Sequence, residues 1–189
     1  MKFMDNKKVA KHALGFIGGK PNVSRYYNDD ETKKIDVMTS DSGVIKGIPT
    51  CATIGLNQTD IGLSAKGKEL RVELVASCDL NPETLGNILA TISFETMDTR
   101  SCAYGTLIPN AVSSYVKGTN LKHAVLMSPV FWPKYQVLED DECTVAWLMV
   151  VPITDSEKKY IEQNGVAAFD NILEREDIDV TNMQRGTVI

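Results

Sequence analysis

The stretch CTVAWLMVVPI, residues 143–153, is apolar along nearly its whole length. A strand with one face toward water alternates polar and apolar residues, whereas this run offers no polar face. A run of this kind is typical of a strand that is covered on both of its faces. We therefore expect residues 143–153 to lie in the interior of a sheet.

Four shorter runs predict further strands, at residues 23–27, 35–38, 51–56 and 70–76. In the last of these runs, Arg71 and Glu73 fall on one face of the strand. The opposite face carries Leu70, Val72 and Leu74. This alternation predicts a strand with one apolar face.

Helix-capping residues predict two helices in the first half of the chain. Asp5 or Asn6 can cap the first, and apolar residues then recur at helical spacing up to Ile17. Asn81 followed by proline is a strong signal for the start of the second helix. Its buried stripe predicts a helix that runs to about Arg100.

Two further helices are predicted near the end of the chain. Thr154 with Glu157 three residues later forms a capping box, and Gly165 ends the helix that it begins. A last short helix follows, with apolar residues between positions 166 and 173, and residues 177–189 are expected to be extended. Strands and helices in this order predict one α+β domain over residues 1–189.

The glycine-rich run GFIGGK, residues 15–20, raises the alternative of a phosphate-binding loop. Such a loop reads G-x-x-x-x-G-K-[ST] and lies between a strand and a helix. Here only three residues separate Gly15 from Gly19, and Lys20 precedes a proline. The run also follows a predicted helix, so its glycines are interpreted as the end of that helix.

Composition and charge limit the classes of function that the chain can have. The chain has 189 residues, 43% hydrophobic and 24% charged, which is ordinary for a globular domain. Its net charge of −5 argues against direct binding of nucleic acid, because phosphate contacts require clustered basic residues. No run is long enough to span a membrane and the first residues lack a secretory signal, so we expect a cytoplasmic protein.

Cysteine and histidine suggest no catalytic or metal site. No two of the four cysteines are spaced as C-x-x-C, so we expect no structural zinc, no other metal and no cofactor. Cys51 and Cys143 lie in apolar strand-like stretches, where a free thiol is usually buried. Cys102 and His123 could form a nucleophile pair only if the fold brought them together. We expect no catalytic residues.

Two acidic turns and one tryptophan are candidates for binding a protein partner. The first turn is NDDE, residues 28–31, and the second is EDDE: Glu139, Asp140, Asp141 and Glu142. Dense carboxylates are often a solvated turn, but they also speed association with a basic protein. Trp132 lies in the proline-flanked segment FWP shortly before the second turn, and tryptophan is favoured at binding hot spots.

Seven stretches of the chain, in this order, resemble the suppressor-of-fused domain family. They are KKVAKHALGFIGGKPNVSRYY, TCATIGL, RVELVAS, NPETLGNILATISF, LIPNAVSSY, SPVFWP and VAWLMVVPITDSE. The resemblance covers nearly the whole chain and implies an α+β domain with helices around a mainly antiparallel sheet. It also implies a role in binding proteins, with no enzymatic activity that defines the family.

The small bacterial branch of that family resembles immunity proteins, or antitoxins, which are paired with LXG-type polymorphic toxins. The resemblance therefore implies direct occlusion of a toxin, expected to be a basic nuclease, in the cytosol of the producer. Under this hypothesis, Trp132 and the four acids at residues 139–142 are the predicted contacts. A regulator that sequesters a transcription factor or another host protein is the alternative. The third hypothesis is an enzyme that uses Cys102, His123 or the two acidic turns.

Overall fold

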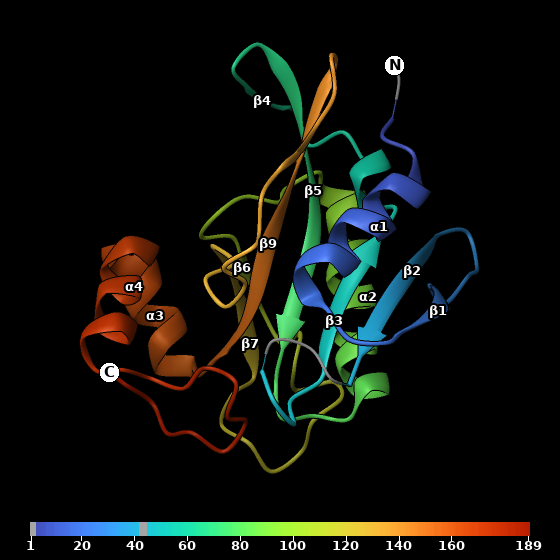
Figure 1. Cartoon of the computed structure of the whole chain (residues 1–189). Helices are drawn as coiled ribbons and strands as arrows, with labels where there is room; N and C mark the ends of the chain where they lie inside the picture. Colours follow the sequence, from blue (N-terminus) through green and yellow to red (C-terminus); the bar gives the residue numbers. More distant parts are fainter. Residues whose placement is uncertain (1–2, 42–44) are drawn as a thin grey trace.

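The structure, a computed structural model, describes residues 3–41 and 45–189. Within them the chain forms one nine-stranded sheet, four α-helices and one 3₁₀ turn (Figure 1). The strands are β1 (Pro21–Tyr27), β2 (Lys34–Ser40), β3 (Thr50–Ile54), β4 (Leu63–Ala65), β5 (Lys68–Ser77), β6 (Leu107–Ile108), β7 (His123–Met127), β8 (Leu138–Glu139) and β9 (Cys143–Ile153). The helices are α1 (Asn6–Ile17), α2 (Pro82–Thr99), α3 (Asp155–Asn164) and α4 (Val166–Arg175), and the 3₁₀ turn is η1 (Leu56–Gln58).

The sheet is antiparallel except at its centre. Its strands lie in the order β1-β2-β3-β5-β9-β7-β6, with β4 also paired to β5 and β8 to β9. Only β5 and β9 run parallel among the described pairs, in register from Glu69 opposite Cys143 to Val75 opposite Met149. The apolar run 143–153 is therefore an interior strand, as predicted, and the α+β class is confirmed.

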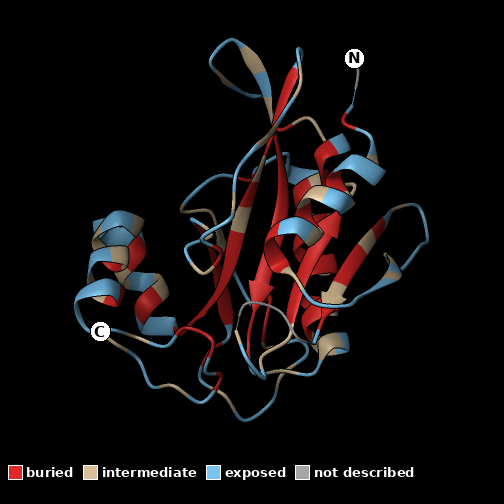
Figure 2. Cartoon of the chain, in the orientation of Figure 1, coloured by how far each residue is buried: buried red, intermediate tan, exposed pale blue. Residues whose placement is uncertain are grey.

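Each face of the sheet carries its own apolar layer, and the central strands are buried along most of their length (Figure 2). Along β9, Val145 and Trp147 point into one layer, whereas Leu148 and Val150 point into the other. Helix α2 contributes to the layer of Leu148 and Val150. Helices α1, α3 and α4 contribute to the opposite layer, so both faces of β9 are covered.

Local capping explains where the helices begin and end. The Asp5 carboxylate accepts the N–H groups of Lys7 and Lys8 at the start of α1, and Gly18 ends that helix with φ of 71°. This positive φ favours glycine, and it confirms that the run at residues 15–20 ends a helix. The predicted capping box at the start of α3 is also present.

The two predicted faces of β5 are confirmed, because Arg71 and Glu73 lie opposite Val72 and Leu74. The polar face is also covered by other parts of the chain, and both of its side chains are buried. One expectation needs correction. Residues 177–189 were expected to be extended, whereas they form turns and irregular backbone with no strand. The tail is held by contacts outside the sheet, among them the ion pair between Arg185 and the buried Glu157 of α3.

Candidate partner-binding site

Trp132 lies in the apolar core and not on the surface. Only 2% of the residue is exposed, and its ring packs edge-on to Phe16 of α1, with 6.4 Å between the ring centroids. Phe16 in turn contacts Trp147 of β9, so these rings form one aromatic cluster beneath α1. The proline-flanked segment that carries Trp132 has no regular secondary structure, yet it fills the core from outside the sheet.

The four acids at residues 139–142 form the tip of the β8–β9 hairpin, which projects from one end of the sheet (Figure 1). Asp140 shapes the turn by accepting the N–H groups of Glu142 and Cys143, each at 2.9 Å. Glu139 lies 3.6 Å from Lys68 of β5, while Asp141 and Glu142 are exposed. The hairpin tip is therefore a negatively charged projection, and the buried Trp132 ring is not part of its surface.

Cys102 and His123 do not form a nucleophile–base pair. Cys102 is buried in an apolar cluster, and burial raises the pKa of its thiol to about 11. The N–H of Asn110 donates to Nδ1 of His123 at 2.9 Å, so Nε2 carries the proton and donates to Asp155 at 2.8 Å. Neither ring nitrogen therefore keeps a free lone pair that could accept the proton of a nucleophile.

Among the described residues, no group of three or more His, Cys, Asp or Glu side chains is placed so that it could hold a metal ion. Cys51 and Cys143 are free and buried, as expected, and burial raises the pKa of Cys51 to about 12. Across the same described part of the chain, no helix is long and apolar enough to cross a membrane.

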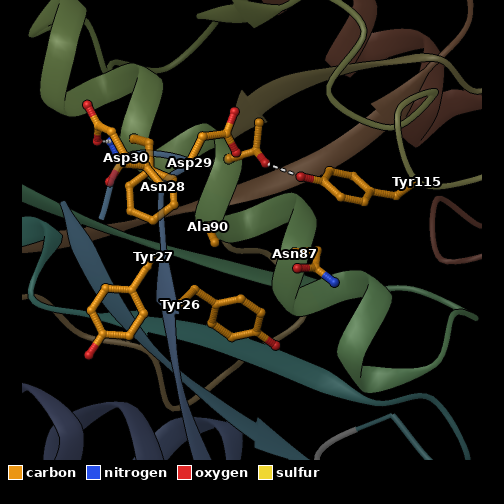
Figure 3. A pocket seen from close by; sticks show the side chains of 10 residues that line it. Tyr26, Tyr27, Asn28, Asp29, Asp30, Asn87, Ala90 and Tyr115 are labelled. Carbon is orange, nitrogen blue, oxygen red and sulfur yellow. Dashed lines mark hydrogen bonds between the residues drawn. The ribbon is translucent and has the colours of Figure 1, made fainter. Parts of the chain in front are cut away.

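A second surface lies beside the turn at residues 28–31, and the sequence alone did not predict it. It is a groove of about 450 Å³ between the end of β1, helix α2 and the loop around Tyr115 (Figure 3). Its lining residues are Tyr26, Tyr27, Asn28, Asp29, Asp30, Asn87, Ala90, Thr91, Phe94 and Tyr115. We call it the tyrosine–aspartate groove.

Hydrogen bonds fix the polar groups of this groove. Asp30 accepts the Thr32 hydroxyl at 2.6 Å and the Asn28 side-chain amide at 2.7 Å. These bonds, chiefly the one from Thr32, lower the pKa of Asp30, so its carboxylate is charged at neutral pH. Across the groove, the Tyr115 hydroxyl bonds to Thr91 of α2 at 2.6 Å (Figure 3).

Gly86 of α2 shapes the same region, because a Cβ at this position would lie 2.2 Å from the Tyr26 hydroxyl oxygen. Glycine inside a helix is otherwise unfavourable by about 0.5–1 kcal/mol relative to alanine. A glycine here therefore indicates that the Tyr26 ring needs the space. Together with the acidic turn at residues 28–31, this glycine within a predicted helix is a sequence signal that could have pointed to the groove.

Replacing Gly86 by alanine is expected to lower the free energy of unfolding by about 1 kcal/mol, because overpacking outweighs the gain in helix propensity. Gly15 of α1 is the matched control, since a Cβ there meets nothing within 4 Å. Gly15→Ala should raise the free energy of unfolding by about 0.5 kcal/mol. Urea denaturation measures both, and equal stabilisation by the two variants would show that Tyr26 does not need this space.

Comparison with known proteins places the chain in a family. A profile described as Suppressor of fused protein (SUFU) matches residues 31–186, which is most of the chain. The chain belongs to the suppressor-of-fused family. One curated relative, Immunity protein YqcF from Bacillus subtilis (strain 168), is 31% identical over 187 residues. The match covers 98% of this suppressor-of-fused chain and 97% of that relative.

Solved structures share the suppressor-of-fused fold. A SUFU homologue from Neisseria gonorrhoeae FA 1090 has a TM-score of 0.75 at 15% identity, covering 97% of this chain and 96% of its own. The Sufu–Fu complex structure gives a TM-score of 0.67 at 14% identity, covering 96% of this chain and 91% of its own. Drosophila Suppressor of Fused has a TM-score of 0.58 at 15% identity and is matched over 43% of its length by 82% of this chain. The predicted resemblance is confirmed.

Proposed function

We propose that this suppressor-of-fused protein is an immunity protein that binds and neutralises a cognate toxin in the cytosol of the cell that makes both. The observation that carries the proposal is the 31% identity to an immunity protein over nearly the full length of both chains. The resemblance of this chain to the suppressor-of-fused family implies protein binding. Membership of that family therefore supports the same role and favours a binding protein over an enzyme. The whole chain, residues 1–189, would act as one binding unit.

Charge supports a basic target. The chain carries a net charge of −5, and its exposed hairpin tip gathers Glu139, Asp140, Asp141 and Glu142. A nuclease domain is basic where it binds the phosphate backbone, so an acidic inhibitor is attracted to that surface. We propose that the toxin is a nuclease and that the tip contacts it, while Trp132 supports the surface only from within the core.

The test is protection of growth. The C-terminal domain of the LXG-type toxin encoded nearest to this chain would be expressed in cells with and without the protein. The proposal predicts survival only with the protein, together with a one-to-one complex on gel filtration. Toxicity that persists in spite of equal expression would reject the immunity role. Capture of a transcription factor from host lysate, in place of a toxin, would favour the sequestering regulator.

Reversal of one charge at the tip tests where the toxin docks. Asp141→Lys is expected to slow association about threefold to tenfold at low salt, because steering depends on long-range attraction. The effect should shrink as salt rises. Glu174→Lys, at an exposed position of α4, makes the same change in net charge and is the control. If both variants slow association equally, or neither does, the tip is not the docking site.

A further inference from the structure

The tyrosine–aspartate groove differs in kind from the hairpin tip, because it combines carboxylates with aromatic rings in a concave surface. Asp29 and Asp30 lie together at one side of the groove, and Tyr115 lies at the opposite side (Figure 3). Its lining residues include no lysine or arginine. The groove therefore presents negative charge that no basic group of its own lining neutralises.

Its aromatic residues are available for contact. Tyr115 is 42% exposed, and Tyr26 and Phe94 are half-buried where they line the groove. The face of an aromatic ring attracts a cation, and a guanidinium stacks on it more readily than an ammonium does. Aromatic rings and carboxylates that line one groove are together matched to a ligand that is both flat and positively charged.

The groove is also organised before any ligand arrives. Asp30 is fixed by Thr32 and Asn28, Tyr115 is fixed by its bond to Thr91, and Gly86 leaves room for the Tyr26 ring. A site whose side chains are already ordered loses less conformational entropy on binding.

We propose that the tyrosine–aspartate groove binds an arginine side chain of the toxin, stacked on its aromatic residues and paired with Asp29 and Asp30. The identity of the partner rests on the proposed function, whereas the chemistry of the site rests on the groove itself. A contrasting groove of about 480 Å³ is lined by Lys8, Lys11 and Lys134 with no acid, and it would repel the same ligand. The two grooves therefore select opposite charges.

The experiment is an NMR titration of the isotope-labelled full chain with the peptide acetyl-Gly-Ser-Arg-Ser-Gly-amide. A second titration uses the same peptide with citrulline, which has the shape of arginine but no charge. The arginine peptide is expected to bind about fivefold more tightly, the combined effect of one exposed cation–π contact and one surface ion pair. Shifts should centre on the amides of residues 26–30, 87–94 and 115. This titration uses no toxin, so its outcome is independent of the immunity role. A negative titration would reject the arginine site alone, and a negative growth-protection test would reject the immunity role alone.

Two variants and one control locate the binding. Asp29→Asn and Tyr115→Leu should each weaken binding of the arginine peptide about twofold, since each removes one of the two interactions. Glu174→Gln, at an exposed position of α4, removes one negative charge away from both surfaces and should leave the affinity of this peptide unchanged. Equal affinity for arginine and citrulline, or shifts centred on residues 139–142, would overturn the proposal. The citrulline comparison uses the unaltered protein, so it decides the matter even if Tyr115→Leu fails to fold.

Discussion

Replacing Arg185 by methionine is expected to lower the free energy of unfolding by about 3–5 kcal/mol, because it leaves a buried carboxylate without its cation. The two guanidinium Nη atoms of Arg185 donate to Glu157 at 2.6 and 3.0 Å. Glu157 is fully buried, and Arg185 also donates to the Pro152 carbonyl at 2.8 Å. This one residue therefore joins the C-terminal tail to the start of α3 and to the end of β9.

The same helix offers a matched control. Lys158 and Glu162 form an ion pair one turn apart on α3, with both side chains partly exposed. Lys158→Met should lower the free energy of unfolding by only about 0.2–0.5 kcal/mol. Urea denaturation followed by circular dichroism measures both variants. Similar small losses in the two would mean that the Glu157–Arg185 pair does not hold the tail.

Interactions close in sequence made much of this fold predictable. The first three helix starts follow from side chains that cap the next turn, such as Asn81, whose carboxamide oxygen accepts the N–H of Thr84. The interior position of β9 follows from its apolar run, since its one polar residue, Thr144, does not define a face for water. These features depend on neighbours that can be read directly from the chain.

Burial and the binding surfaces depend on residues far apart in the sequence. Glu73 and Arg71 are buried because η1 and other segments cover the polar face of β5. The charged residues of that face do not indicate that it is covered. Trp132 lies in the core because its irregular segment packs beneath α1, which the flanking prolines do not indicate. The tyrosine–aspartate groove joins β1, α2 and the loop at Tyr115, so its shape exists only once the sheet order is set.

Glu73→Leu is expected to lower the free energy of unfolding by about 4 kcal/mol, because several buried donors lose their acceptor at once. The Glu73 carboxylate accepts the N–H groups of Gly55, Leu56 and Asn57, at 2.8, 3.3 and 3.1 Å. It also accepts the Thr53 hydroxyl at 2.6 Å and the Asn57 side-chain amide at 2.7 Å. Leucine has a similar volume but satisfies none of them.

Glu73→Gln distinguishes the contribution of these hydrogen bonds to stability from the contribution of the negative charge. Its carbonyl oxygen can keep the donors from Gly55 and Asn57, and its amide can donate to the Thr53 oxygen, so only the Leu56 N–H and the Thr53 O–H lose this acceptor. We expect this variant to lose about 1–2 kcal/mol. If the leucine and glutamine variants were equally stable, the loss would come from the charge and not from the unsatisfied donors.

The pH dependence gives the same residue a second test. Burial raises the pKa of Glu73, and the bonds from Thr53 and Asn57 oppose that rise only in part. The folded state therefore holds the proton more tightly than the unfolded state, and stability falls as pH rises through the folded pKa. The contribution of Glu73 is complete below its unfolded pKa, and the advantage of the natural protein over Glu73→Gln should shrink as pH increases. An advantage that grows with pH would show that the five donors favour the carboxylate more than burial disfavours it.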